Sequence, residues 1–418
     1  MRQARARGRW AGLAGFCALL LLLFSARCTR EPQLSLQTQI DAADVGATIT
    51  IEPGEYIESL HIEKPIVLEG AGDSPEDVRI IGSVGGVAAI DIEGDVHVEI
   101  RNLTIERGTG GVELKDEAQI ALSHVAIVDA HASGITLYDS ASAVLDRCTI
   151  ANSFRNGVSL TDASSLHAVQ CRFSANGAAG IAASTRGTVV ICDSQIAVSG
   201  ECGAELRGNT RSEFRQVEFG TNGWSETSTT ILDPFSRSGL WLSGNSQTLV
   251  DGCVIVDSCG IGILIEDSAA LEAQKTEILQ SGDAGVAADD AADAELRDCA
   301  VIDGRGWGVG AWGASHVVLR TVDVSHNALT GIVAVGSSHT ELYGSVVSGN
   351  GEGGVAAYTL ECYQEREGLA PFYGLLVGSG NTIPGPSEGF GNARFATCPE
   401  RLRELLCKSV DGGDSAAE

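Results

Sequence analysis

Apolar and polar positions alternate along most of this chain in a pattern that repeats every 23 residues. Residues 133–155 (SGITLYDSASAVLDRCTIANSFR) align without a gap with residues 156–178 (NGVSLTDASSLHAVQCRFSANGA). In each repeat a glycine is followed by a branched or small apolar residue, and further apolar residues follow at every second position. Alternation with a period of two is typical of β-strands, and each repeat has room for three short ones.

The glycines allow the repeat to be followed along the chain. Successive marker glycines lie 23 residues apart except at one step of 36, which indicates 13 extra residues in an insertion region placed at 221–237. A unit of three short strands cannot bury its apolar side alone, so neighbouring units must stack in register at about 4.8 Å. The pattern predicts a single all-β domain, a parallel β-helix of about 12 coils. The marker residues are Gly111, Gly134, Gly157, Gly180, Gly203, Gly239, Gly262, Gly285, Gly308, Gly331 and Gly354.

The composition indicates a core of small and aliphatic side chains. Aromatic residues make up only 5% of the chain, and we attribute the 52 glycines to tight turns. Four cysteines occupy one inward position of the repeat and are expected to be buried free thiols, with a bridge between adjacent coils as the alternative for the first two. These cysteines are Cys148, Cys171, Cys253 and Cys299.

The ends of the chain depart from the repeat. Residues 29–48 are predicted to form a linker and an N-terminal cap, with a short helix within 34–46, and residues 49–358 to form the β-helix. Residues 359–407 are expected to form an irregular C-terminal cap with a short helix within 398–407, followed by a disordered tail at 408–418. In this cap Cys362 is expected to pair with Cys398 or Cys407.

Residues 1–28 have the composition of a targeting segment. Four arginines precede an apolar run over residues 11–24, which is too short for a comfortable membrane span of about 20 residues. The segment resembles a bacterial lipoprotein signal, which implies lipidation at Cys28, although Arg27 departs from the small residue usual at that place. We predict export to the cell envelope or the medium, with membrane contact through a lipid anchor only. Simple secretion and an uncleaved anchor are the alternatives.

The charge of the chain restricts its partners. The formal net charge is −27 at pH 7. Such a charge repels nucleic acid and anionic lipid surfaces, and it disfavours polyanionic substrates unless cations bridge them. We therefore expect no nucleic acid as a partner, and a polysaccharide or a cell-surface protein instead.

The glycine-marked repeat resembles the right-handed β-helix repeats of the pectin-lyase-like superfamily and of NosD-type periplasmic proteins. The resemblance implies a right-handed coil and says little about activity, because this fold has many functions. Known catalytic motifs of the superfamily are present only in part. The matching fragments are Gly54, Tyr56 and Glu58 of a pectin methylesterase-like opening, Asp289-Asp290 of polygalacturonases and Asp233-Pro234 of alginate epimerases.

In enzymes that this fold resembles, the site lies on the strand after the glycine. Here that strand offers Glu266 and Asp289 at the same position of adjacent coils, where their carboxylates could lie about 5 Å apart, as in retaining glycosidases. Asp290 follows at the next position, where aspartate recurs in five coils, so a solvated turn ladder is the alternative interpretation. The recurring residues are Asp116, Asp139, Asp162, Asp267 and Asp290.

Metal ligands are a further possibility, although no cofactor is required. Asp293, His316 and His339 occupy one position of three consecutive coils, with Glu295 and Glu341 two residues further along. Two histidines and a carboxylate suit zinc, copper or iron, whereas exposed histidines on a polar face are often only solvated. Calcium could bind the stacked aspartates of the first coils, although each coil offers only one carboxylate.

Aromatic residues gather on the strand after the glycine. In a chain this poor in aromatics the placement suggests a ligand-binding surface, and packing under the insertion is the alternative. The candidate ligand-binding residues are Trp224, Trp241, Trp307, Trp312 and Tyr358, with Glu205 and Arg207 beside them. We therefore expect a carbohydrate-binding or surface-structural protein, and as the alternative an enzyme, a polysaccharide lyase or glycoside hydrolase, acting on this face.

Overall fold

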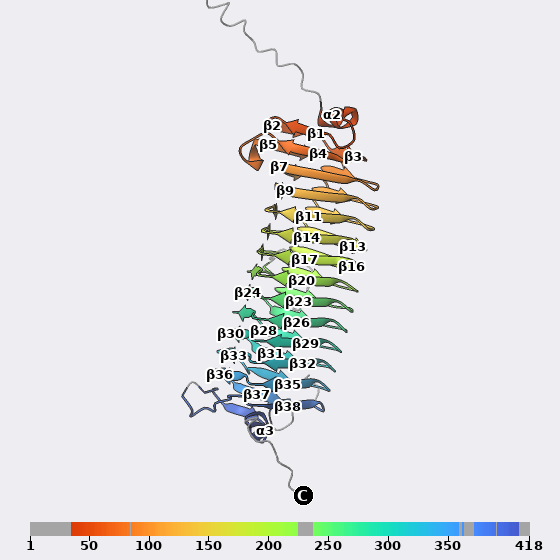
Figure 1. The fold of residues 1–418 in the computed structure, drawn as a ribbon. Coiled ribbons are helices and arrows are strands. Elements are labelled where there is room, and N and C mark those ends of the chain that lie inside the picture. Colours follow the sequence, from red (N-terminus) through yellow and green to blue (C-terminus); the bar gives the residue numbers. More distant parts are fainter. Residues whose placement is uncertain are drawn as a thin grey trace, which may run out of the picture.

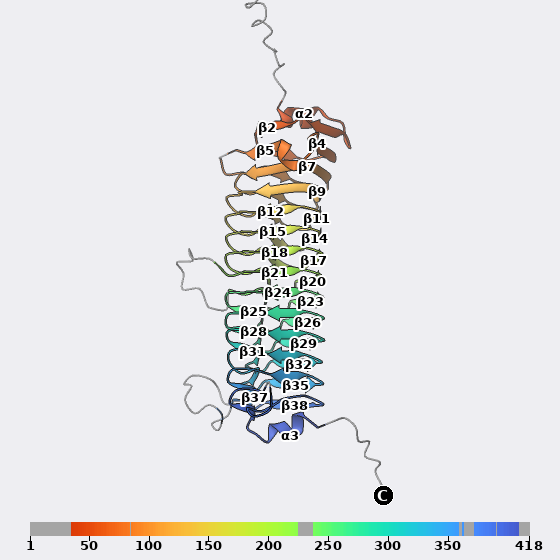
Figure 2. The same ribbon diagram turned by 90° about the vertical axis from the view of Figure 1, so that its left-hand side faces the viewer.

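The computed structural model describes residues 35–83, 85–224, 237–358, 362, 372–389 and 391–408. The described chain winds into coils that stack one below the other into a rod (Figures 1 and 2). The predicted all-β solenoid is confirmed. The targeting segment with Cys28 and most of the insertion at 221–237 lie outside the described residues.

Each coil except the last contributes one strand to each of three columns, and the last has only an isolated bridge in the second column. The strand after the glycine belongs to a parallel sheet of 14 strands, here called sheet B. Its strands are β3 (Leu60–Ile62), β6 (Ile90–Ile92), β8 (Val112–Leu114), β10 (Ile135–Leu137), β13 (Val158–Asp162), β16 (Ile181–Thr185), β19 (Ala204–Leu206), β22 (Leu240–Leu242), β25 (Ile261–Ile265), β28 (Ala284–Ala288), β31 (Trp307–Ala311), β34 (Ile332–Ala334), β37 (Gly353–Ala357) and β39 (Phe395–Cys398).

The other two columns are joined into one sheet of 25 strands because β7 and β9 are long enough to run through both. Column A1 consists of β1 (Thr48–Ile51), β4 (Ile66–Gly70), β7 (His97–Arg107), β9 (Gln119–Val128), β11 (Ser142–Asp146), β14 (Ser165–Val169), β17 (Thr188–Cys192), β20 (Arg211–Arg215), β23 (Gln247–Asp251), β26 (Ala270–Gln274), β29 (Asp293–Arg297), β32 (His316–Arg320), β35 (His339–Tyr343) and β38 (Leu375–Ser379). Column A2 consists of parts of β7 and β9 with β2 (Gly54–Ile57), β5 (Val78–Gly82), β12 (Thr149–Ala151), β15 (Arg172–Ser174), β18 (Gln195–Ala197), β21 (Glu218–Gly220), β24 (Val254–Val256), β27 (Glu277–Leu279), β30 (Ala300–Ile302), β33 (Asp323–Ser325) and β36 (Val346–Ser348).

The corners of each coil use the left-handed backbone region. In the coil that begins at Gly134, Asp139 (φ 51°), Arg147 (φ 53°) and Asn152 (φ 58°) stand at the ends of β10, β11 and β12. A single left-handed residue turns an extended chain sharply, which Asn and Asp tolerate best among residues with a side chain. Two or three such residues in each glycine-marked coil from Gly111 to Gly331 therefore set where its strands end.

The marker glycines are not turn residues, so the prediction that tight turns account for the glycines is wrong for them. A Cβ on Gly262 would lie 2.5 Å from the carbonyl oxygen of Gly285 and 2.6 Å from the Ile278 side chain. Nearer the N-terminal end, Val112 N donates to the carbonyl oxygen of the marker residue Gly134 at 2.9 Å, so the glycine backbone is itself part of the ladder. The repeat needs glycine because the next coil and an inward side chain both approach closely.

The inward ladders are as predicted. All four repeat cysteines are buried and free, and Cys148 and Cys171 form no bridge although Cys148 N lies 3.4 Å from Cys171 Sγ. The largest buried side chains include Phe173, Phe214 and Phe219. The core is otherwise aliphatic, in agreement with the composition.

The N-terminal cap is the expected short helix, α2 (Leu36–Ala42), which lies over the first coil (Figure 1). Leu36 and Ile40 are buried against the core, and Ser35 accepts a hydrogen bond from Thr38 N as N-cap. Glu58 accepts from Leu36 N at 2.7 Å and from Gln37 N at 3.1 Å. Glu58, one of the residues of the methylesterase-like opening, therefore caps this helix.

The C-terminal end corrects the predicted boundary at residue 358. Strands β38 and β39 pair in register with β35 and β37, so the coils continue into the segment expected to be an irregular cap. They lack the glycine-marked pattern, which is why the sequence did not reveal them. The expected terminal helix is α3 (Leu402–Leu406). The disulfide joins Cys362 to Cys398, one of the two pairings left open, and Cys407 is a free thiol.

A buried asparagine ladder supports this end of the rod. Asn350 Oδ1 accepts from Asn327 N and Asn327 Nδ2, at 3.0 and 3.1 Å. Asn350 Nδ2 donates to Val324 O and to Asn392 Oδ1, both at 3.0 Å. Four hydrogen bonds thus connect three coils through one buried side chain, a network that the sequence reading missed.

Replacing Gly262 by alanine should lower the free energy of unfolding by about 1–3 kcal/mol, because the new methyl group overlaps the next coil. Gly85→Ala is the matched control, since a Cβ there meets nothing within 4 Å, and it should change the free energy by less than about 0.5 kcal/mol. Urea unfolding followed by circular dichroism measures both. Equal effects of the two substitutions would contradict the close-approach explanation.

Asn350→Ala should destabilise the protein by about 2–4 kcal/mol, because it leaves buried backbone and amide groups without partners. Ser258 occupies the same position of another coil, is buried, and its hydroxyl has no hydrogen-bond partner. Ser258→Ala should therefore be neutral or stabilising in the same unfolding assay. A loss for Ser258→Ala as large as that for Asn350→Ala would mean that the position, and not the ladder, determines stability.

Candidate functional site

The outer face of sheet B changes character along the rod. From β8 to β19 the middle outward position is mostly polar or small, as in Glu113, Ser159 and Glu205. From β22 onward the same position is apolar in each successive strand. The residues at this position are Trp241, Leu264, Ala287, Gly310, Val333 and Ala356, here called the apolar strip.

Three tryptophans cover the apolar strip. Trp241, Trp307 and Trp312 are half-buried and pack against a buried apolar cluster that includes Leu264, which is only 2% exposed. The rings of Trp307 and Trp312 meet edge to face with centroids 5.7 Å apart. Trp312 lies across Gly310, where a Cβ would be 1.8 Å from the ring. The structure therefore brings these tryptophans together, and it places part of each ring in packing.

The other two predicted aromatic residues differ from these three tryptophans in their exposure. Tyr358 is 5% exposed and packs with Val333 and Val335, so its ring supports the strip instead of facing outward. Trp224, at the start of the insertion, is 60% exposed. The predicted row of exposed rings is thus partly a packed cluster.

Arg207 and two glutamates surround Trp241 at the edge of the strip. The Arg207 guanidinium lies over the indole, 4.7 Å from the ring centroid, and pairs with Glu205. Trp241 Nε1 donates to Glu266 Oε2 at 2.7 Å. Burial raises the pKa of Glu205, with the nearby Arg207 acting in the opposite direction. We call Glu205, Arg207, Trp241 and Glu266 the Trp241 cluster.

The candidate catalytic residues have structural partners. Glu266 belongs to the Trp241 cluster, and Asp289 Oδ1 accepts from Asp290 N at 2.7 Å. Asp290 is a left-handed corner (φ 55°), and its Oδ2 lies 3.4 Å from Asp267 N. The first coils show the same ladder, in which each aspartate accepts from the coil before it: Gly94 N to Asp116, Asp116 N to Asp139, and Asp139 N to Asp162. This arrangement is what turn chemistry alone produces.

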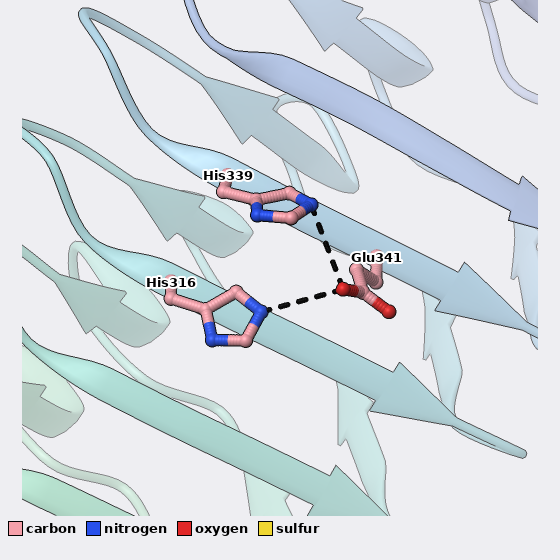
Figure 3. A group of neighbouring side chains, drawn as sticks. All are labelled: His316, His339 and Glu341. Carbon is pink, nitrogen blue, oxygen red and sulfur yellow. Dashed lines mark ion pairs between the residues drawn. The ribbon is translucent and has the colours of Figure 1, made fainter.

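The two predicted histidine ligands do come together, on the outer face of column A1 (Figure 3). His316 Nε2 and His339 Nε2 each lie 3.5 Å from Glu341 Oε1. Asp293 was predicted as the third member of this group, and this prediction is wrong. Asp293 contacts the opposite nitrogen, His316 Nδ1, at 3.1 Å. Glu341 takes that place.

Neighbouring side chains hold the Glu341 carboxylate in its orientation beside the two histidines. Tyr343 donates to Glu341 Oε2 at 2.9 Å, and Arg320 lies over the Tyr343 ring at 4.8 Å. Burial pushes the pKa of Glu341 upward, but the hydrogen bond from Tyr343 and the two neighbouring imidazoles outweigh it and leave this pKa below its usual value. Glu295 is engaged elsewhere, by Arg297 at 2.7 Å and Arg320 at 3.3 Å.

Sequence reading missed two further features among the described residues. An open cleft of about 510 Å³ crosses column A1 from β20 to β32, where the small Ala270 lies between longer outward side chains, and its lining includes Arg211, Glu272, Asp293 and His316. A second histidine–carboxylate group, His61, Glu63 and Glu93, lies near the N-terminal end. Its carboxylate Glu93 pairs with Lys115. Within the described part of the chain, no helix has the length and apolar character that crossing a membrane requires.

The fold is similar to those of solved enzymes and phage proteins. The catalytic unit of an α-1,3-glucanase from Streptomyces thermodiastaticus strain HF3-3 is similar with a TM-score of 0.50 and 15% identity over 83% of this chain. The match spans 65% of the length of that catalytic unit. A pectate lyase matches with a TM-score of 0.41 and 12% identity, covering 76% of this chain and 74% of its own. A tailspike protein from an Escherichia coli O157:H7 bacteriophage matches with a TM-score of 0.41 and 10% identity, covering 73% and 40%.

The sequence comparisons identify the fold family of the chain and no activity. No curated protein matches the sequence significantly. The family profile described as a right-handed β-helix region matches residues 66–219 and 238–364, which together are more than half of the chain. The stacked parallel coils, the glycine ladder and this match agree, and the chain belongs to the right-handed β-helix family.

Proposed function

We propose that this protein is a carbohydrate-binding β-helix protein that contacts its ligand with the Trp241 cluster and the neighbouring part of the apolar strip. The observation that carries the proposal is the combination of an indole, a guanidinium and two carboxylates at one place, where a polar sheet face becomes apolar. Elsewhere along the described part of sheet B the outward position is polar, small or covered.

The chemistry of this cluster suits a sugar. The C–H face of a pyranose ring packs on an indole, while its hydroxyl groups donate to carboxylates and accept from a guanidinium. The Arg207 side chain is 51% exposed, so its donors can reach a ligand. Because Glu205 already neutralises Arg207 and the whole chain is acidic, a neutral polysaccharide is favoured over a polyanionic one.

The enzyme alternative is weaker on this face. A glycosidase pair needs one carboxyl group that is free to protonate the leaving oxygen and a second one opposite it. Here Glu266 accepts from an indole and Asp289 from a backbone amide, in roles that hold side chains in place. Binding without cleavage is therefore the function that this geometry supports best.

Binding should be measured by affinity electrophoresis on a panel of polysaccharides that includes α-1,3-glucan, since a glucanase of this fold acts on that polymer. Arg207→Ala and Trp241→Ala should each weaken binding by about tenfold or more, a change of about 1.4 kcal/mol. Arg215→Ala is the matched control, because Arg215 also pairs with a glutamate two residues earlier but lies on column A1. It should bind as the wild type does.

Three outcomes would overturn the proposal. The first is a wild type that binds no polymer of the panel, and the second is an Arg215→Ala variant that loses binding as Arg207→Ala does. The third is release of soluble products by the wild type that stops in Glu266→Gln while binding persists, which would show an enzyme. A lower melting temperature for Trp241→Ala with unchanged binding would identify the indole as packing only.

We also propose that the protein is exported and held to a membrane by a lipid on Cys28. The support is the order of arginines, apolar run and cysteine in residues 1–28. Cys28→Ser should move the protein from the membrane fraction to the soluble fraction, and the wild type should incorporate labelled palmitate. Equal distribution of wild type and variant between the two fractions would contradict the anchor.

A further inference from the structure

The His316, His339 and Glu341 group has an atomic arrangement that suits a shared metal ion better than a pair of hydrogen-bonded ion pairs. Both Nε2 atoms are buried and neither has a hydrogen-bond partner, although each faces the same carboxylate oxygen at 3.5 Å. That separation is long for a charge-assisted hydrogen bond, which has about 2.7–2.9 Å between nitrogen and oxygen. A tetrahedral ion with bonds of about 2.0–2.1 Å places its ligand atoms about 3.3–3.5 Å apart.

We propose that His316 Nε2, His339 Nε2 and the Glu341 carboxylate form a binding site for a divalent transition-metal ion of the zinc class. The ligand atoms come from two adjacent strands, β32 and β35, and lie within 4.8 Å of one another (Figure 3). Two imidazoles and one carboxylate are a ligand set that Zn²⁺ accepts, with a fourth position for water. This site lies on column A1 and is independent of the sugar-binding face of sheet B.

The surrounding residues have the arrangement that metal-binding histidines usually need. Asp293 Oδ1 lies 3.1 Å from His316 Nδ1, so the proton is favoured on Nδ1 and the Nε2 lone pair is directed toward Glu341. Tyr343 binds Oε2 of Glu341 and leaves Oε1 toward the imidazoles. Val318 fills the equivalent outward position on the His316 strand, so no second carboxylate or cation competes there.

The second histidine–carboxylate group supplies an internal control. It has one imidazole instead of two, His61 Nε2 already contacts Glu63 Oε1 at 3.2 Å, and Lys115 neutralises Glu93. A cation would have to displace the lysine to use that carboxylate. His61 should therefore contribute nothing to metal affinity.

The test is titration of the full-length protein with Zn²⁺ by calorimetry, and with Co²⁺ by absorption spectroscopy. The wild type should bind one ion at this site and give the d–d bands of a four-coordinate Co²⁺ ion without thiolate charge transfer, which separates it from the free cysteines. His339→Ala and Glu341→Gln should each weaken binding by about tenfold or more, and His61→Ala should leave it unchanged. All three side chains are outward, so circular dichroism should show unaltered folding.

Each contrary result has a definite meaning. No heat and no cobalt bands in the wild type would show that the group is an ion pair only. Binding that persists in His339→Ala but is lost in His61→Ala would move the site to the other group, and thiolate charge transfer would move it to a cysteine. Zn²⁺ should also raise the melting temperature of the wild type and not that of His339→Ala, because binding to the folded state alone stabilises it.

Discussion

The structure depends on the requirement that every coil present the same backbone to the next one. Parallel strands are connected only between neighbouring coils, so an error in length at one corner would shift the inward side chains of a whole strand outward. The left-handed corners fix the strand lengths, and the glycine ladder allows the carbonyl of each coil to accept a bond from the coil before it. The insertion after residue 220 is compatible with this requirement because the pairing of β19 with β22 resumes in register beyond it.

Most of the fold could be predicted because the same physical demand is repeated eleven times. Spacing alone revealed the coils, the inward cysteines and the place of the insertion. Where the demand is met only once, the sequence offers no pattern: β38 and β39 pair by backbone contacts without the marker glycine, and Asn392 completes the asparagine ladder from a segment outside the repeat. The role of the glycines was also misread, because composition cannot distinguish a residue that turns from one that must lack a side chain.

The sites were harder to predict than the fold, for a geometric reason. The repeat position of a residue tells which side chains are stacked on one another in adjacent coils. It does not tell which way a long side chain bends. Asp293, His316 and His339 share a column, yet Asp293 and Glu341 contact opposite nitrogens of His316. Likewise Glu266 and Asp289 occupy equal positions, but Trp241 on the preceding coil engages only one of them. Contacts between side chains at different repeat positions decide these outcomes, and they become visible only with side chains in place.

A stacked coil also explains how two unrelated surfaces can coexist on one rod. The inward positions and the backbone ladder provide the stability, so outward residues contribute little to folding and are free to differ from coil to coil. Chemistry then arises where two or three adjacent coils depart together from the bland polar ladder of the first half. On sheet B the departure is from polar to aromatic at β22. On column A1 the position of Arg211, Gln247 and Ala270 in successive strands becomes aspartate at β29 and histidine at β32. Because both departures lie in the C-terminal half and face different directions, a sugar polymer bound on one face would leave a metal ion on the other accessible to solvent.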